Sequence, residues 1–119
     1  MGLLIMKKEE FYIYQEELIR YKFSHDKLSI SKMVVELNKQ FCSAGMKKLR
    51  IETITNYLVK QGFLFLNEEG YKRPTIKGKV LGISVEKIVK ENKEYMVNQY
   101  NRRAQSYVLD MLYDMIREN

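Results

Sequence analysis

Near the middle of the chain, apolar residues follow first the period of a helix and then the period of a strand. Ile51, Ile54 and Leu58 recur at about 3.6 residues, which predicts a helix over about 50–61 that buries one face. A glycine ends this run. Alternating Phe and Leu residues, a polar turn and a basic return segment follow, and they predict a β-hairpin over about 63–74.

The first twenty-odd residues also show a helical pattern. Phe11, Tyr14, Leu18 and Tyr21 recur at spacings of three and four, which predicts a helix over 7–23. Aromatic residues at this spacing are more often part of a core than a platform for stacking bases.

A short strand and another helix are expected next. Residues 28–30 alternate and predict the first small strand, and Ser31 can cap a helix over 32–41 by accepting a backbone N–H. The apolar stripe of this helix contains Met33, Val34, Leu37 and Phe41.

The segment after the predicted hairpin leaves one alternative open. Thr75 follows a proline and can cap a short helix over 76–81. Residues 83–100 fit either a helix capped by Ser84 or a second hairpin around the polar residues 90–93. Because β-branched and aromatic residues are frequent on both sides of the polar break, the hairpin is favoured.

The chain ends with a strongly amphipathic segment, for which Asn101 is a good N-cap and which predicts a helix over about 101–117. Its apolar residues repeat at coiled-coil spacing, and others widen the stripe. Such a helix needs more than one partner surface, so we expect a homodimer through this helix; a monomer with the helix folded across the N-terminal helix is the alternative. The expected dimer interface comprises Ala104, Val108, Met111, Leu112 and Met115.

The positive charge is concentrated in one stretch. The net charge of the whole chain is +6, and residues 46–79 hold eight basic and three acidic residues, a net charge of +5. A concentrated positive field attracts a polyanion by steering and counterion release. A solvated surface that keeps the protein in solution is the competing interpretation.

If the polyanion is duplex DNA, the helix over 50–61 would enter the major groove with its polar side, because short polar and basic side chains reach base edges and phosphates there. That side is expected to carry Thr53, Asn56 and Lys60. Phosphate contacts are expected from Lys47, Lys48 and Arg50 before the helix and from Lys72, Arg73, Lys77 and Lys79 after it. Glu52, Glu68 and Glu69 lie in the same stretch and would oppose binding if they covered this surface.

Catalysis is not predicted. With one histidine, His25, and one cysteine, Cys42, no nucleophile–base pair, internal disulfide or structural zinc site can be assembled, so we expect no enzyme, no metal and no cofactor. No apolar run approaches the ~18 residues of a membrane span, and in the apolar residues 1–6 the lysines follow instead of preceding, unlike a secretory signal. A cytoplasmic protein is expected.

The order of elements resembles a winged helix-turn-helix, in which a recognition helix precedes a β-hairpin wing. The join PTIKGKVLGI at 74–83 and the helix opening YNRRAQ at 100–105 resemble uncharacterised small winged-helix proteins of Gram-positive bacteria and their mobile elements. The resemblance covers about 28–112. It implies an α+β fold, a winged helix-turn-helix with an additional β-hairpin and a C-terminal amphipathic helix, in a single domain over 1–119.

Two functions follow as expectations. The first is a small non-enzymatic DNA-binding protein, a transcriptional regulator or mobile-element accessory protein that binds duplex DNA through the helix over 50–61 and the basic wing. The second is a protein–protein interaction module on the same scaffold without DNA binding, because one fold serves many roles.

Overall fold

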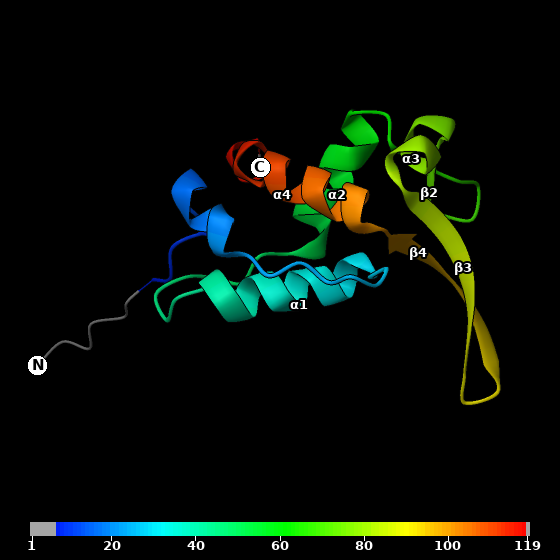
Figure 1. Cartoon of the computed structure of the whole chain (residues 1–119), viewed down its shortest axis with the longest axis horizontal. Helices are drawn as coiled ribbons and strands as arrows, with labels where there is room; N and C mark the ends of the chain where they lie inside the picture. Colours follow the sequence, from blue (N-terminus) through cyan, green and yellow to red (C-terminus); the bar gives the residue numbers. More distant parts are fainter. Residues whose placement is uncertain (1–6, 119) are drawn as a thin grey trace, which may run out of the picture.

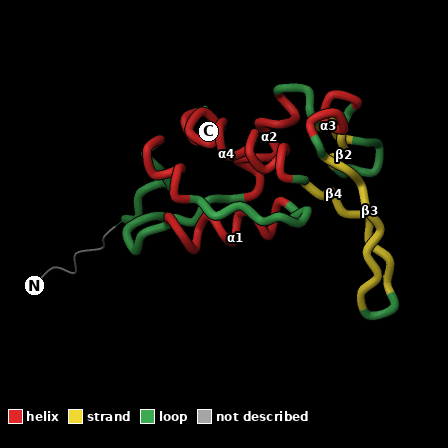
Figure 2. Tube along the Cα trace, viewed as in Figure 1, coloured by secondary structure: helices red, strands yellow, loops and turns green. Residues whose placement is uncertain are grey.

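The computed structural model describes residues 7–118; residues 1–6, where the sequence showed no secretory pattern, lie outside the described part. The chain forms a mixed α+β fold with four α-helices, a 3₁₀ helix and two separate antiparallel hairpins in this range (Figure 1). The hairpin over residues 83–100 projects from a helical body, as Figure 2 shows by colour.

The helix predicted over 7–23 is wrong. Residues 7–14 form no helix or strand, and only Gln15–Arg20 form a short 3₁₀ helix, η1. In this extended segment the side chains of Phe11 and Ile13, two residues apart, are buried, whereas Tyr14 is 58% exposed. Backbone pairing explains the difference. The amide of Glu9 donates to the Gly45 carbonyl (2.9 Å), and the Lys47 amide donates to the Glu9 carbonyl (2.7 Å), so one isolated parallel bridge holds the segment beside the connector.

Helix α1 spans Ile30–Phe41 and begins two residues earlier than the sequence suggested. Its N-cap is Ser29, whose hydroxyl accepts from the Lys32 amide, and not Ser31. Asn38 fixes the connector that follows, because its side-chain amide donates to the Leu49 carbonyl (3.1 Å) and accepts from the Leu49 amide (2.7 Å).

Helix α2 spans Ile51–Lys60, as the apolar period predicted. Strands β1, Leu64–Leu66, and β2, Lys72–Pro74, pair antiparallel and confirm the first hairpin. Helix α3, Ile76–Leu81, follows at once, capped by the Thr75 hydroxyl, which accepts from the Gly78 amide.

Gly78 packs α3 against the start of the first hairpin. A Cβ at this position would overlap with the carbonyl oxygen of Phe63, so only glycine allows the two segments to approach this closely. The Thr75 hydroxyl also donates to the Gly62 carbonyl (2.6 Å). The β1–β2 hairpin and α3 therefore form one unit that is fixed to the end of α2.

The second hairpin confirms the strand interpretation of 83–100. Strands β3, Ile83–Lys90, and β4, Lys93–Tyr100, pair in register from end to end around a two-residue turn. Both turn residues, Glu91 and Asn92, have positive φ, 53° and 65°, as a tight hairpin turn requires.

The predicted strand at residues 28–30 is reduced to one bridge. Leu28 exchanges two backbone hydrogen bonds with Tyr100 of β4, at 3.0 and 2.7 Å. This edge therefore joins the second hairpin and not the β1–β2 hairpin.

Helix α4, Arg102–Arg117, begins at Asn101, whose side chain accepts from the Ala104 amide (3.0 Å). It crosses the body beside α2 and supplies the centre of the core (Figure 1). The residues predicted to form a dimer interface are part of this core. Ala104, Val108 and Leu112 are 0% exposed, Met115 is 1% exposed, and Met111 is partly buried.

Four of the five residues expected at a dimer interface are therefore buried within one chain, and homodimerisation itself stays a prediction. The helix does have two partner surfaces, but both come from its own chain, because α2 and η1 pack against it. A residue with no exposed surface offers nothing to a second copy. The apolar stripe of α4 therefore predicted how much of the helix is buried, but it did not identify the surface that packs against it.

Candidate nucleic-acid interface

The solvent side of α2 is the surface that the charge pattern singled out. Glu52, Asn56 and Lys60, spaced by four residues, are exposed along it. Thr53 does not share this side, contrary to expectation. It is only 9% exposed and is turned toward α4.

A lysine of the first hairpin reaches onto this side of α2. The Lys72 ammonium donates to the Asn56 side-chain oxygen (2.7 Å) and to the Thr55 hydroxyl (2.8 Å). Both acceptors are neutral, so the contacts fix the position of the cation without cancelling its charge. The hairpin thus places a positive group beside the exposed part of a helix.

Arg73, the other predicted contact of the hairpin, has a different environment. Its guanidinium donates to the Asn98 side-chain oxygen (3.1 Å) and the Met96 carbonyl (3.2 Å) of β4, and it lies over the Tyr71 ring (5.2 Å). Asn98 in turn donates to the Lys72 carbonyl (2.8 Å). Arg73 therefore joins the two hairpins, and its donors are already partly used.

The remaining predicted cations fall into two groups. Lys47 pairs with Glu10 (3.0 Å), Lys60 pairs with Glu118 (3.4 Å), and the Lys77 ammonium donates to the Gln61 carbonyl (2.8 Å). Within residues 7–118, three of the predicted cations have no such partner. These are Lys48, Arg50 and Lys79.

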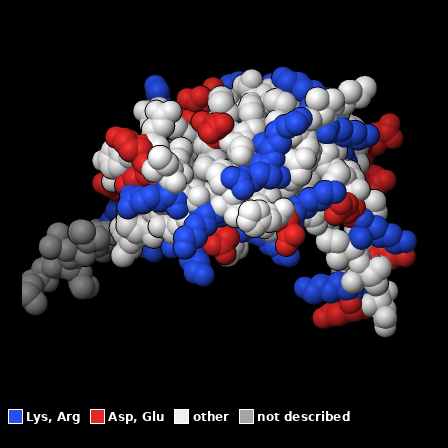
Figure 3. Space-filling view, viewed as in Figure 1, with Lys and Arg blue, Asp and Glu red and all other residues white. Residues whose placement is uncertain are grey.

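Carboxylates limit the positive surface on two sides. Glu52 is exposed in the first turn of α2, and Glu68 and Glu69 are exposed at the turn of the first hairpin. On the α4 side, burial raises the pKa of the Tyr57 phenol, and the charges of Asp114 and Glu118 raise it further. The solvent side of α2 therefore has a carboxylate at its N-terminal end, and Lys72 lies beside Asn56 further along the helix. Figure 3 shows basic side chains over much of the body and both signs of charge at the free end of the β3–β4 hairpin.

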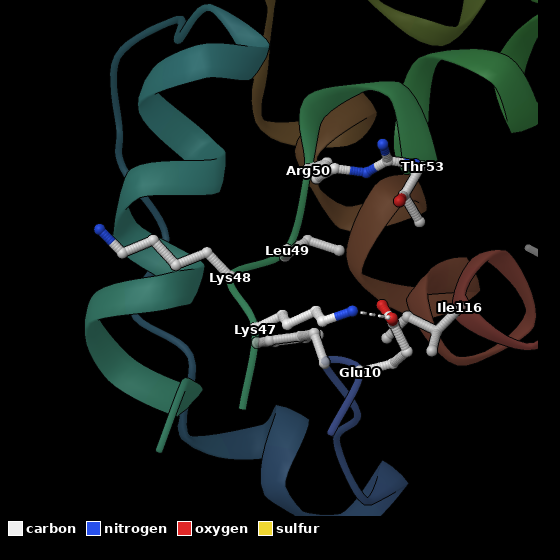
Figure 4. A pocket seen from close by; sticks show the side chains of 8 residues that line it. Glu10, Lys47, Lys48, Leu49, Arg50, Thr53 and Ile116 are labelled. Atoms are coloured by element: carbon white, nitrogen blue, oxygen red, sulfur yellow. Dashed lines mark hydrogen bonds and ion pairs between the residues drawn. The ribbon is translucent and has the colours of Figure 1, made fainter. Parts of the chain in front are cut away.

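A cleft of about 530 Å³ opens at the N-terminal end of α2. Its walls come from the N-terminal segment, the connector before α2 and the last turns of α4 (Figure 4). The lining residues are Glu10, Phe11, Lys47, Lys48, Leu49, Arg50, Thr53 and Ile116. The lining of the cleft thus includes three of the predicted phosphate-binding cations and Thr53.

Sequence reasoning missed the groups that hold these cations in place. Thr55 and Asn98 were not singled out. Thr55 lies on the apolar face of α2, four residues after Ile51, and this is a signal that could have identified it, because a polar side chain on a packed face usually satisfies a particular partner. Asn98 lies among other polar residues of β4, so no comparable signal in the sequence points to it.

Other sites were sought in the described residues. Residues 7–118 contain no group of three or more His, Cys, Asp or Glu side chains placed to hold a metal ion. None of the helices in this range combines the length and the apolarity that crossing a membrane would require. Comparisons of the chain with protein-family models, with curated proteins and with solved structures each found no match. The resemblance to winged-helix proteins therefore stays a prediction.

Proposed function

We propose that this protein binds duplex DNA through the solvent side of α2 and the β1–β2 hairpin, in the manner of a winged helix-turn-helix. The order α1, connector, α2, hairpin supports this fold assignment. The observation that carries the function is the contact of the Lys72 ammonium with Asn56 and Thr55, because it fixes a cation of the hairpin on the exposed side of the helix.

The charge distribution supports the same surface. Residues 46–79 carry a net charge of +5. Lys72, Arg73 and Lys77 bond to neutral acceptors and so keep their full charge, and Lys48, Arg50 and Lys79 add to it. Cations that are already positioned lose less side-chain entropy on meeting a phosphate. In this proposal Asn56 faces the base edges, and Lys48 and Lys72 contact phosphates.

The test is a fluorescence anisotropy titration with a random-sequence duplex at several salt concentrations. Each phosphate contact adds about 0.9 to the slope of log affinity against log salt. The double variant K48Q/K72Q should therefore weaken binding on every sequence and flatten the slope by roughly two. The matched control is K39Q, which replaces an exposed lysine near the end of α1. It should change neither the affinity for the duplex nor the salt slope.

Two results would contradict the proposal. One is the absence of any duplex binding at low salt by the unmodified protein. The other is a slope for K48Q/K72Q equal to that of K39Q while circular dichroism shows both variants to be folded.

A second candidate function rests on the β3–β4 hairpin. Its outer half exposes Val89, Tyr95 and Met96, which are 64%, 48% and 52% exposed, and residues 83–100 carry three acidic and three basic side chains. An apolar, charge-balanced projection suits a protein partner better than a polyanion. We propose this interaction role as the alternative. It is favoured if the duplex titration fails and if Y95E/M96K abolishes a self-association that sedimentation detects in the unmodified protein.

A further inference from the structure

The cleft at the N-terminal end of α2 is lined by a hydroxyl that has no partner in the described protein. Thr53 as a whole residue is 9% exposed, and its hydroxyl makes no hydrogen bond to any group in residues 7–118. Figure 4 shows its oxygen turned toward the space between Arg50, Lys47 and Ile116. Because this hydroxyl opens onto the cleft, water can reach it, and an acceptor group of a ligand could take the place of that water.

The start of α2 supplies further donors at the same place. The first amides of a helix have no acceptor within it. Arg50 is the N-cap of this ten-residue helix, and its side chain makes no capping hydrogen bond. The amides of Ile51 and Glu52 therefore remain open, at the end where the helix dipole favours an anion.

The charged side chains around the cleft also favour an anion. Arg50 has no hydrogen-bond or ion-pair partner in residues 7–118, and Figure 4 shows it extending toward Thr53. Lys47 pairs with Glu10, whose side chain is 81% exposed and can move away into solvent. Lys48 points away from the other side chains and contributes at a distance (Figure 4). Glu52 is exposed on the solvent side of α2, outside the lining of the cleft.

The remaining lining is apolar. Phe11 and Leu49 are each 4% exposed, and Ile116 is partly buried. A volume of about 530 Å³ is much larger than a single anion needs and falls within the range of small-molecule sites. The cleft thus offers donors at one end and apolar walls along its side.

We propose that this cleft binds a small phosphorylated molecule with an apolar or aromatic part. Its phosphate would accept hydrogen bonds from Thr53, Arg50 and the first amides of α2, and its apolar part would pack against Phe11 and Ile116. A free molecule fits better than a DNA backbone, because the Thr53 hydroxyl is recessed on the α4 side of the helix. This site goes beyond the proposed function, since it does not share the solvent side of α2.

The test is a titration of the full chain, followed by amide chemical shifts, at constant ionic strength. Inorganic phosphate and adenosine 5′-monophosphate are the two probes, and adenosine without phosphate is the ligand control. We expect saturable shifts at Ile51, Glu52 and Thr53 with both phosphate probes, tighter binding of the nucleotide because of the apolar walls, and no comparable shifts with adenosine.

Variants at one position test the role of the hydroxyl. Thr53→Val keeps the shape and removes the donor, and it should weaken nucleotide binding about tenfold, the usual effect of losing a hydrogen bond to a charged group. Thr53→Ser keeps the hydroxyl and should restore most of the affinity. K39Q should bind like the unmodified protein.

The proposal is overturned by any of three results: shifts that do not saturate with either phosphate probe, equal affinities for Thr53→Val and K39Q, or shifts of these amides by duplex DNA alone. Thr53→Val should leave the salt slope for duplex DNA unchanged. Failure of the duplex titration with intact nucleotide binding would therefore contradict only the proposed function, and the reverse result would contradict only this site.

Discussion

The two hairpins of this chain are stabilised in different ways. The β1–β2 hairpin has three residue pairs, and side chains fix it to its surroundings: Lys72 to α2 and Arg73 to β4. The β3–β4 hairpin has eight pairs, and in the described residues the only hydrogen bond or ion pair that another element makes to its outer half is the one from Arg73 to the Met96 carbonyl. A two-stranded hairpin is at best marginally stable alone. One hairpin is therefore stabilised by tertiary contacts, and the other by its length, its turn and its packed base.

This difference separates the roles of their charged residues. In the short hairpin, cations act as structural links and still present positive charge to solvent. In the long hairpin, charges of both signs lie on exposed strands, as in the Lys87–Glu94 pair (2.8 Å), with side chains 55% and 64% exposed. Exposed pairs of this kind contribute little to stability, typically ~0.2–1 kcal/mol. Removing a charge should therefore affect the fold in the first hairpin more than in the second.

The largest expected effect comes from separating the short hairpin and α3. Gly78→Ala would push a methyl group into the carbonyl oxygen of Phe63, and because backbone cannot yield as a side chain does, we expect a loss of about 3 kcal/mol or more in the free energy of unfolding. Urea denaturation measures it. Gly45→Ala is the control, since a Cβ there meets nothing within 4 Å, and it should change stability by less than about 0.5 kcal/mol.

An intermediate effect is expected at the link between the hairpins. Arg73→Met removes the donors to Asn98 and Met96 and keeps most of the aliphatic stem, so we expect a loss of about 1–2 kcal/mol in urea denaturation. Arg20→Met, on η1, changes the same groups at an exposed position and should have little effect. Equal losses in the two variants would show that Arg73 does not join the hairpins.

The smallest expected effect concerns the turn of the long hairpin. Glu91 and Asn92 both have positive φ, and Asn-Gly is the preferred pair for such a turn. The double variant E91N/N92G should therefore stabilise the hairpin by roughly 0.5–1 kcal/mol. Amide exchange should slow in β3 and β4 and stay unchanged in α2. A slowing of exchange throughout the chain would mean that the long hairpin does not open independently.

Features that depend on neighbouring residues, such as helix caps and the apolar period of a helix, could be predicted well from the sequence. The caps at Thr75 and Asn101 and the apolar period of α2 depend on neighbouring residues, and all three were confirmed. The second hairpin was favoured over a helix by β-branched residues around a polar break, and the structure has it.

The sequence did not predict which segments pack against one another. The aromatic residues between Phe11 and Tyr21 match a helical period, yet backbone pairing of Glu9 with the connector keeps this segment extended. Thr53 lies at the edge of the polar side of its helix, and only the position of α4 decides that it is buried. The α4 stripe likewise predicted burial correctly but assigned it to a second chain.

The sequence by itself determined where most helices and strands begin and end, and where positive charge concentrates, because these depend on residues close together in the chain. The tertiary structure alone decided which of the cations remain unpaired, that Arg73 links two hairpins, and that the Thr53 hydroxyl faces a cleft. Those properties depend on groups that approach from distant segments: β4 for Arg73, and α4 with the N-terminal segment for the cleft. No pattern within the helix over 50–61 contains that information.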